Sequence, residues 1–504
     1  MQKFCCFMCL LCVFALVSGS VVAEPFQRYI VEFGKSDISG ATRADIIKNS
    51  QKLLDKNIQK LKKIFKSMND GDLNKLWFIN AVALTASGND IAKIKSMPEV
   101  KNVVKSEYRI WLDKDIAKTP VNHRPEDITW SVQKMRAPEV WNEFKIDGAG
   151  IVVGHLDTGV FAEHPALEGK ILAFKDFTPE AKDHPFDGQG HGSHTAGTIV
   201  GGQGVGVAPG ARLVVARVFD SKGGTTTEIL LSAMQWVMDP DGDADTNDGP
   251  RLVSNSWGSN DSTDTVFWDA VQAWIDAGIL PVFAAGNNGW MGGKVGTPAA
   301  FPHSWAVAAT TKTDGLAYFS SQGPVSWNGE TLIKPDISAP GNGVVSCSHT
   351  GGMVSNSGTS MACPGVAGVC ALMFQADPAL TYEQIRLIAE ETSKDLGEEG
   401  KDNKFGAGLI DAYAAVKKIL ENAELANSYL AYEAALNTEY ALIGSQAVSP
   451  LAAPLARSII ERTARLDEGQ YRALCLKVAQ ECGESAAKLL KEANSLRVAR
   501  GLNH

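Results

Sequence analysis

Cysteine is scarce and irregularly placed in this 504-residue sequence. Four of the nine cysteines fall in an apolar N-terminal stretch, which leaves an odd and scattered set of five: Cys347, Cys363, Cys370, Cys475 and Cys482. Such a set excludes a disulfide framework and allows at most two bridges. Cys363 and Cys370 are expected on one helix face with about 10 Å of rise between them, too far apart to pair. We therefore expect both to be buried free thiols.

Long hydrophobic runs are also missing, and after the N-terminus we expect no transmembrane segment. The first apolar run, Phe4 to Val17, follows the basic Lys3 and precedes the small residues Val21-Val22-Ala23. It is shorter than the ~20 residues that a spanning helix needs, which favours a secretory signal peptide over a membrane anchor. A lipoprotein signal would want small residues before Cys9 or Cys12, and they are absent. The interpretation is a signal peptide over residues 1–23 and a secreted protein, extracellular or in the cell envelope.

The chain lacks the basic stripe that a nucleic-acid-binding surface would need. Its net charge is −9, but residues 24–118 carry 18 Lys and Arg against 12 Asp and Glu, whereas residues 119–504 have a net charge of −16. The basic residues of the first segment alternate with apolar ones along an expected helix. This division indicates two segments of complementary charge and no nucleic-acid partner.

Residues 24–118 have the pattern of a small α+β module. Apolar side chains at Ile47, Leu54, Ile58, Leu61 and Phe65 fall on one face of a helix. The expected elements are strands at 27–33, 76–86, 100–105 and 108–112 and helices at 42–67 and 90–97. The polar, proline-bearing stretch 113–127 is typical of an exposed linker.

The following section alternates strands with helices. A continuous apolar strand over 150–156 is of the kind found in a sheet covered on both faces. Further strands are expected at 213–218, 252–256, 279–284 and 305–309, and helices at 191–200, 227–238, 266–277, 360–375, 381–392 and 411–421. A capping box at Thr225 and Glu228 would open the second of these helices. The alternation predicts a mostly parallel α/β sheet flanked by helices, with functional residues at the carboxyl ends of its strands. Beyond about residue 420 the pattern predicts a helical tail.

Four motifs carry candidate chemistry, and each is weak alone. Asp157 follows a strand in Asp-Thr-Gly, a triplet that aspartic proteases also use, but a second copy is absent. His191 opens a helix in Gly-His-Gly-Ser-His. His194 would make a metal pair only in a zinc pattern that needs an interposed glutamate, so we expect it to point into the helix as a packed, hydrogen-bonded residue. Asn287 lies in a turn after a strand. Ser360 lies in Ser-Gly-Thr-Ser at the start of an apolar helix, where it caps the helix or acts as a nucleophile.

Taken together and in this order, the motifs resemble those of the subtilisin-like serine proteases, the subtilases. The resemblance covers about residues 128–418. It implies that Ser360 is the nucleophile, His191 the general base and Asp157 the residue that orients it, and that Asn287 and the Ser360 N–H hold the oxyanion. It also implies an edge strand for extended substrates, with substrate-binding residues Ser256, Trp257, Gly258, Ala285 and Gly286.

The resemblance extends to the domain organisation. It implies a signal peptide (1–23), a ferredoxin-like inhibitory propeptide (24–118), a catalytic domain (119–420) and a helical C-terminal extension (421–504). The expected partners are protein or peptide substrates and the chain's own propeptide, which would occupy the cleft until it is cut.

The sequence departs from the family pattern at points that concern metal binding. The stretch 201–205 is short where calcium-stabilised relatives have a longer loop, which puts the family's first calcium site in doubt. Residues 239–248 are rich in carboxylates but fail the EF-hand register, so a solvated acidic loop and a structural calcium site are both open. This loop and the His191 motif are most similar to the bacillopeptidase F branch. The chemistry itself is expected to need no cofactor and no catalytic metal.

The prediction is a secreted, self-processing serine endopeptidase. One alternative is a catalytically silent relative that binds peptides as a partner. A second is an exopeptidase, which would need an acidic group to hold the substrate's amine. No residue in the sequence could be assigned to that group.

Overall fold

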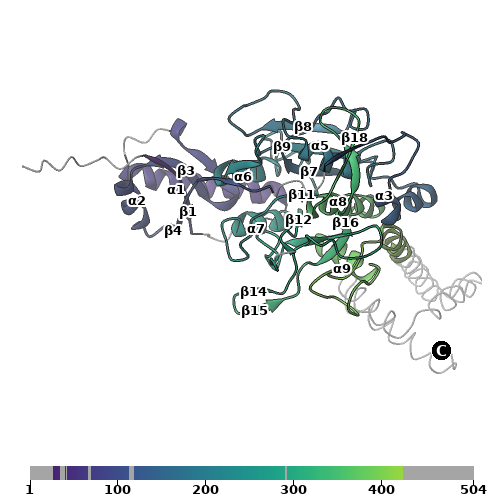
Figure 1. Cartoon of the computed structure of the whole chain (residues 1–504). Coiled ribbons are helices and arrows are strands. Elements are labelled where there is room, and N and C mark those ends of the chain that lie inside the picture. Colours follow the sequence, from purple (N-terminus) through teal and green to yellow (C-terminus); the bar gives the residue numbers. More distant parts are fainter. Residues whose placement is uncertain are drawn as a thin grey trace, which may run out of the picture.

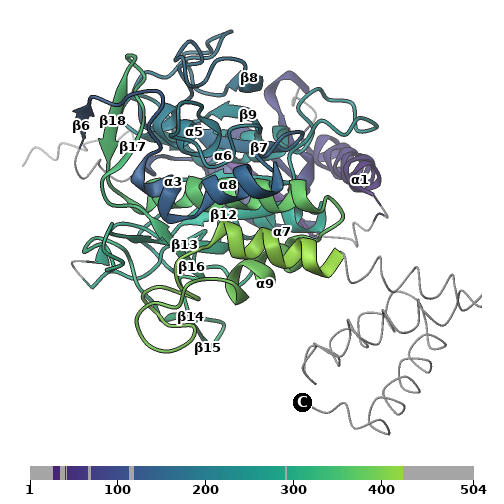
Figure 2. The ribbon, with the colours of Figure 1, turned by 90° about the vertical axis from the view of Figure 1, so that its right-hand side faces the viewer.

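The structure is a computed structural model that describes residues 26–34, 40, 42–65, 70–112, 118–289 and 292–423 (Figure 1). The expected signal peptide, the C-terminal extension from residue 424, Cys475 and Cys482 lie outside these residues. In the described part, an N-terminal module and a larger α/β domain lie side by side. The last described helix, over residues 412–423, lies at the end of the larger domain opposite the module (Figure 2).

The N-terminal module is an antiparallel sheet with two helices, which agrees with the predicted α+β module, but the strand expected at 108–112 is not part of its sheet and pairs with the larger domain instead. Its strand order is β2-β3-β1-β4. Helix α1 begins with a capping box in which Thr42 and Asp45 bond each other's backbone, and its buried face includes Ile47, Leu54 and Leu61. The bounds are β1 Gln27–Phe33, α1 Arg43–Ile64, β2 Asn74–Leu76, β3 Ala81–Ala86, α2 Gly88–Lys95 and β4 Val100–Lys105.

The single strand expected at 76–86 is wrong, because the chain turns in the middle of it. Trp77–Ile79 form a 3₁₀ turn that ends at Asn80, whose φ of 50° lies in the left-handed region. Asparagine tolerates this conformation better than most residues. The Asn80 side chain is buried and bonds the carbonyl of Gly34 and the amide of Asn57. The turn folds β2 back beside β3.

The larger domain is built on a seven-stranded parallel sheet of order β16-β13-β12-β11-β7-β9-β8, which confirms the predicted α/β class. Its strands are β7 Val152–Asp157, β8 Ile171–Asp176, β9 Arg212–Arg217, β11 Leu252–Asn255, β12 Leu280–Ala284, β13 Trp305–Thr310 and β16 Ile337–Pro340. Strands β16 and β8, at the two edges of the sheet, were not predicted. Strand β16 has only four residues. Strand β8 is longer. It lies at the sheet edge and is only partly buried, so its pattern is weak.

Both faces of the sheet are covered, because successive strand residues belong to different cores. Val153, Val215 and Leu252 pack with helices α5 and α8, whereas Leu156, Val214 and Val253 pack with α6, α7 and the apolar residues of the N-terminal module. The helices are α5 His191–Val200, α6 Thr227–Trp236, α7 Trp268–Asp276, α8 Thr359–Ala376 and α9 Tyr382–Glu391, and short ones at Trp130–Lys134 and Ala137–Glu139 are α3 and α4.

Helix α8 is apolar all round because it is buried all round. Among the described residues it is the one helix long and apolar enough to cross a membrane, and 89% of it is buried inside the protein. Cys363 and Cys370 on this helix, with Cys347, are buried free thiols, as predicted for the first two. Burial raises the pKa of Cys363 to about 12, so this thiol is unreactive at neutral pH.

Two local expectations are corrected. The cap of α6 is Thr226, whose side chain accepts from the Ile229 N–H, while Thr225 lies in strand β10 (Gly224–Thr226). The stretch 113–127 is not wholly a linker, because Thr119–Val121 form strand β6, which pairs with β18 (Met353–Asn356). The remaining strands are β5 Tyr108–Ile110, β14 Val325–Trp327, β15 Glu330–Leu332 and β17 Val344–Cys347.

Candidate active site

Asp157 is the last residue of β7, at the carboxyl edge of the sheet where functional residues were expected. It is almost fully buried, and its Oδ1 accepts from His191 Nδ1 and from the Thr158 N–H, both at 2.7 Å. Its Oδ2 lies 3.1 Å from the hydroxyl of Thr195. Burial alone would raise the pKa of Asp157, but the His191 charge and these hydrogen bonds lower it below its ordinary value. The group is therefore an anion held behind an imidazole.

His191 is fixed by the loop that precedes α5. The Asp187 carboxylate accepts from the Gly190 N–H at 2.8 Å and from the Ser193 N–H and hydroxyl, and the Thr158 hydroxyl also donates to it. Gly190 has a φ of 101°, a conformation that favours glycine. This carboxylate ties the loop to the end of β7 and so sets the direction in which His191 points.

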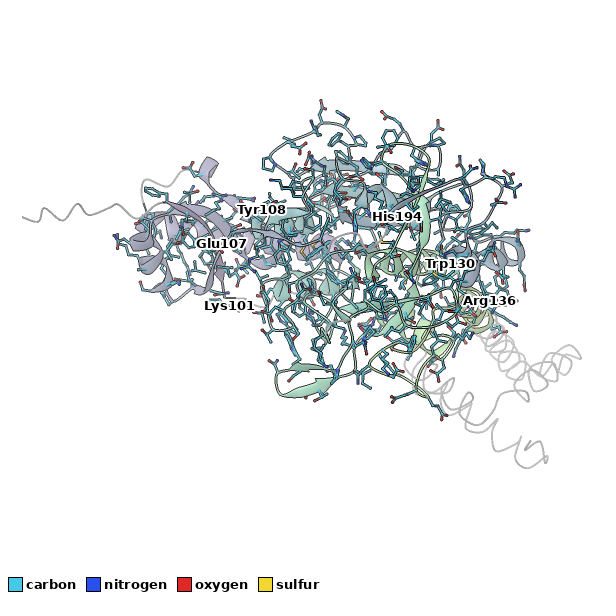
Figure 3. The ribbon with its side chains drawn as sticks, in the orientation of Figure 1. Lys101, Glu107, Tyr108, Trp130, Arg136 and His194 are labelled. Atoms are coloured by element: carbon cyan, nitrogen blue, oxygen red, sulfur yellow. The ribbon has the colours of Figure 1, made fainter. Side chains whose placement is uncertain are left out.

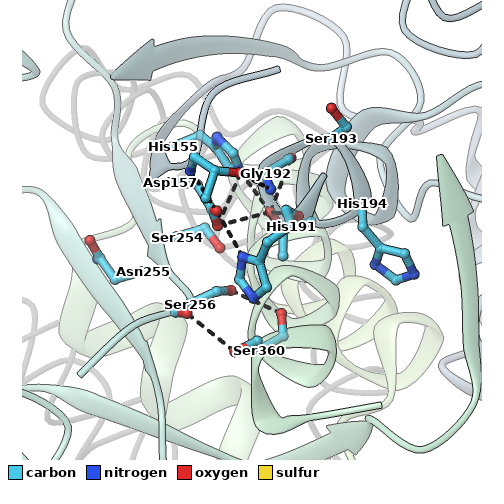
Figure 4. A network of polar contacts seen from close by, with 12 residues as sticks. His155, Asp157, His191, Gly192, Ser193, His194, Ser254, Asn255, Ser256 and Ser360 are labelled. Carbon is cyan, nitrogen blue, oxygen red and sulfur yellow. Dashed lines mark hydrogen bonds and ion pairs between the residues drawn. The ribbon is translucent and has the colours of Figure 1, made fainter. Parts of the chain in front are cut away.

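Ser360 lies in the first turn of α8, where backbone N–H groups have no partner within the helix. Its Oγ donates to the Ser256 carbonyl at 3.2 Å, and the Ser256 hydroxyl donates back to the Ser360 carbonyl at 2.9 Å. Figure 4 shows the imidazole of His191 between Asp157 and Ser360. The structure therefore brings together the three residues that the sequence names as a triad.

Asn287 is anchored through its side-chain oxygen. Its Oδ1 accepts from the backbone N–H of Thr359 at 2.8 Å and from the Thr359 hydroxyl at 3.0 Å. The Thr359 oxygen in turn accepts from the Gly286 N–H. Because Oδ1 is bonded to Thr359, the Nδ2 group lies on the opposite side of the amide, close to Gly358. A Cβ atom added to that glycine would lie 3.6 Å from Nδ2. This places an amide donor beside the first turn of α8.

The predicted substrate-binding residues line one hollow with Ser360: Ser256, Trp257, Gly258, Ala285 and Gly286. The Trp257 side chain is almost fully buried, although the residue lines the hollow. Its ring makes edge contacts with Phe219, Phe267 and Phe283. These contacts hold the strand end 256–258 against the sheet and leave its backbone for hydrogen bonding.

The chain's own segment 108–112 enters this hollow. Strand β5 pairs with β10 in an antiparallel register, and beyond it the N–H groups of Trp111 and Leu112 donate to the Gly223 carbonyl. On the other side, the Gly258 N–H donates to the Trp111 carbonyl at 3.2 Å. The Trp111 ring packs against Trp257 and Phe267. An extended segment of the chain thus lies between the start of β10 and the residues that follow β11.

The two other histidines near His191 have different surroundings. His194 is buried and its Nε2 lies 3.0 Å from the Val344 carbonyl, which confirms the predicted packed, hydrogen-bonded role. His155 was not singled out from the sequence, although it lies two residues before Asp157. It is buried behind Asp157 and bonds Thr195. A polar residue inside an apolar strand was the signal that could have found it.

The carboxylate-rich loop fits a hard cation. Asp239, Asp241 and Asp248 each offer an oxygen, and these oxygens lie within 4.8 Å of one another. Asp239 is only 8% exposed, and its Oδ1 has no hydrogen-bond partner within the described part of the chain. Burial and the neighbouring carboxylates raise the pKa of Asp239 and of Asp248. A calcium ion, which prefers several oxygen ligands, would relieve that repulsion.

Comparison with known proteins agrees with this geometry. A model of the subtilase family matches residues 148–408. The chain is 32% identical over 405 residues to bacillopeptidase F of Bacillus subtilis (strain 168), a match that covers 72% of this chain and 28% of that relative. It is 32% identical over 296 residues to Subtilisin Savinase of Lederbergia lenta, covering 58% of this chain and 100% of that protein. It is 27% identical over 399 residues to Subtilisin amylosacchariticus of Bacillus subtilis subsp. amylosacchariticus, covering 78% and 91%. The chain therefore belongs to the subtilase family of subtilisin-like serine endopeptidases.

Proposed function

We propose that the protein hydrolyses internal peptide bonds through Asp157, His191 and Ser360. The observation that carries the proposal is the buried Asp157–His191 hydrogen bond of 2.7 Å, with the imidazole facing a serine in the first turn of a buried helix. In this reaction Ser360 Oγ attacks the carbonyl carbon and His191 Nε2 takes its proton. His191 then gives that proton to the leaving amine, and water releases the acyl group by the reverse sequence.

Asp157 and Asn287 stabilise charge that develops during these steps. Asp157 holds the Nδ1–H of His191 and stabilises the imidazolium. The Asn287 Nδ2 and the Ser360 N–H donate to the oxyanion, and the loss of one such donor typically costs about 10²–10³ in kcat. The bonds from Thr359 to Asn287 Oδ1 keep the amide in the required orientation.

Cleavage inside a chain is supported by the path of the chain itself. Trp111 lines the hollow beside Ser360, and Lys118 Nζ donates to the Gln189 carbonyl, two residues before His191. The described residues that flank segment 113–117 thus contact the surroundings of Ser360 and of His191. We propose that the maturation cut falls in this segment. An exopeptidase would hold a chain end here instead.

Residues 24–118 act, in this proposal, as an intramolecular inhibitor. The backbone bonds of 108–112 to Gly223 and Gly258 are those that an extended substrate would make, so the uncut chain blocks the hollow. The signal-like N-terminus supports secretion as part of the same proposal. The Asp239–Asp241–Asp248 cluster would hold a structural calcium ion that takes no part in the chemistry.

The test is a comparison of the wild-type chain with Ser360→Ala in a purified system. The wild type is expected to cut itself, to label with a serine-directed fluorophosphonate and to cleave a peptide blocked at both ends. Ser360→Ala is expected to remain uncut and unlabelled. Absence of label on the matured wild type would favour the silent relative, and cleavage of free-ended peptides alone would favour the exopeptidase. Normal processing of Ser360→Ala would contradict self-maturation.

The calcium proposal has its own measurement. EDTA is expected to lower the melting temperature of the wild type, and Asp239→Asn, which removes one charge of the cluster, is expected to abolish that shift. The control is Asp245→Asn, a residue of the same loop that pairs with Lys48 and is not in the cluster. An EDTA effect that survives in Asp239→Asn, or no effect on the wild type, would contradict the site.

A further inference from the structure

His155 lies directly behind the Asp157–His191 pair and has no part in the roles proposed above. It stands two residues before Asp157 on β7, so both side chains project from the same face of the sheet, as Figure 4 shows. The side chain is 1% exposed. Its Nε2 lies 2.8 Å from Thr195 Oγ1, while its Nδ1 has no hydrogen-bond partner among the described residues.

Thr195 joins this histidine to the catalytic carboxylate. It follows His191 by about one turn on α5, and its Oγ1 lies 3.1 Å from Asp157 Oδ2. The same oxygen lies 3.2 Å from the His191 carbonyl and 3.1 Å from the Gly192 carbonyl. A hydroxyl has one proton to give, and of these acceptors the carboxylate is the only anion and forms the strongest bond.

The direction of the two bonds depends on which nitrogen of His155 carries the proton. With the proton on Nε2, His155 donates to Thr195 and Thr195 donates to Asp157. With the proton on Nδ1, a buried N–H would have no acceptor, and the bare Nε2 would compete with Asp157 for the threonine proton. With the proton on Nε2, only the lone pair of Nδ1 lacks a partner, so this tautomer is the more stable of the two.

We propose that His155 is a positioning residue, whose Nε2–H holds the Thr195 hydroxyl so that it donates to Asp157 Oδ2 and fixes the carboxylate behind His191. The inference rests on the triad roles proposed above. The charged or titratable groups that face His155 are Asp157, His191 and Asp187, and burial lowers the pKa of His155 below its ordinary value, which keeps the ring neutral. A neutral ring is the donor that this arrangement requires.

The bond to Oδ2 has a consequence for His191. Oδ1 is already occupied by His191 and Thr158, and Thr195 disperses the negative charge on the other oxygen. Without that donor the carboxylate would attract the imidazolium proton more strongly, so His191 would become more basic. The acidic limb of the pH profile of kcat/KM would then move to higher pH.

The experiment measures kcat and the pH profile of kcat/KM on matured variants. Thr195→Val keeps the shape and removes the donor, and is expected to lower kcat by about tenfold and to raise the acidic limb by about 0.5 pH unit. Thr195→Ser restores both. His155→Leu is expected to change both in the same direction by less, and His155→Gln, whose amide can donate from the Nε2 position, restores them. In the Thr195→Val background His155→Leu moves the limb no further.

Each outcome decides the proposal. If His155→Leu and His155→Gln lose kcat equally and the acidic limb does not move, His155 has a packing role only. If the shifts of the acidic limb in Thr195→Val and His155→Leu add in the double variant, the two residues act independently. Either result overturns the proposal. If His155→Leu fails to fold, the Thr195 pair decides, because a wild-type limb in Thr195→Val overturns it too. Ser360→Ala is assayed alongside. Activity in that variant would contradict the triad itself, whereas an inactive Ser360→Ala with an unmoved Thr195→Val limb contradicts only the role of His155.

Discussion

The contact between the N-terminal module and the catalytic domain uses charge differently from the interior of that domain. Across the contact, Arg28 pairs with Glu228 at 2.7 Å and Lys101 with Asp269 at 2.6 Å, and the basic partners are 31% and 48% exposed. Figure 3 shows Lys101 and Tyr108 along the side of the module that faces the domain. These pairs join the basic and acidic segments that the charge division predicts. They retain much of their contact with water, so their separation costs little.

Inside the catalytic domain, one carboxylate is surrounded by cations and removed from water. Asp336 is 3% exposed and bonds Lys334 at 2.6 Å, Lys401 at 3.2 Å and Arg386 at 3.4 Å. Its Oδ2 also accepts from the Ala306 N–H, at the start of β13. If Asp336 were separated from these cations, a charge would be left buried without a counter-charge. The difference is consistent with the proposal that the module is released from a permanent catalytic fold.

The largest expected effect comes from removing the anion of the buried cluster. Asp336→Asn leaves Lys334, which is as buried, without its counter-charge, and we expect a loss of about 3–5 kcal/mol in the free energy of unfolding. Denaturation in the uncut Ser360→Ala background would measure it without autolysis. The matched control is Asp55→Asn, which breaks an exposed pair with Lys75 and should change stability by under about 1 kcal/mol. Equal effects would contradict the comparison.

Protonation of Asp336 is expected to destabilise the protein in acid. Burial would raise the pKa of Asp336, but Lys334, Arg386 and Lys401 lower it to about 2 from an ordinary 3.8. Because the folded state holds the proton less tightly, this stability is fully present above about pH 4 and is lost as the pH falls toward 2. The loss is on the order of 2 kcal/mol. The wild type should therefore lose more stability than Asp336→Asn between pH 5 and pH 2, and parallel curves would contradict the assignment.

Trp111 is the apolar exception in the releasable contact. It is 3% exposed, its ring packs against Trp257 and Phe267, and its backbone bonds Gly223 and Gly258. Trp111→Ala should weaken the hold of the cut module by about 2–4 kcal/mol, which is about 30-fold to 1,000-fold. The measurement is the delay between self-cleavage and the appearance of activity on a peptide substrate. That delay should shorten sharply in Trp111→Ala and much less in Trp111→Phe. An unchanged delay would show that the tryptophan does not anchor the module.

The grouping of Asp157, His191 and Ser360 could be predicted from the sequence because each of the three motifs marks a local structural need. Each motif can be recognised within a few residues of sequence. A strand ends at Asp157, a glycine-rich turn precedes His191, and a helix of small residues follows Ser360. The parallel sheet followed from the same alternation of apolar strands and helices. The order of these motifs along the chain then identified the family.

What the sequence could not show are contacts between distant residues. The bonds from Thr359, at the start of α8, to Asn287 join residues 72 positions apart, and the Thr158 hydroxyl donates to Asp187 across 29 residues. The role of segment 108–112 as a strand between β10 and Gly258 depends on pairing across more than a hundred residues. His155 and Thr195 are ordinary residues of a strand and a helix until the fold brings them to one carboxylate.

The smallest expected effect concerns the exposed pairs, and it tests the comparison from the other side. Arg28 binds both oxygens of Glu228 at 2.7 Å, and this bond lowers the pKa of Glu228 against the opposing effect of burial. Arg28→Ala should weaken the hold of the cut module by about 1 kcal/mol, or about fivefold, at low salt. At 1 M salt the wild type should weaken toward the variant, because exposed charges are screened there. The fraction of module that remains bound after cleavage, measured by size exclusion, reports both effects. Lys75→Ala breaks a more exposed pair that lies wholly within the module and should leave that fraction unchanged. A salt-independent loss in Arg28→Ala would mean that the arginine acts through its packed stem and not through its charge.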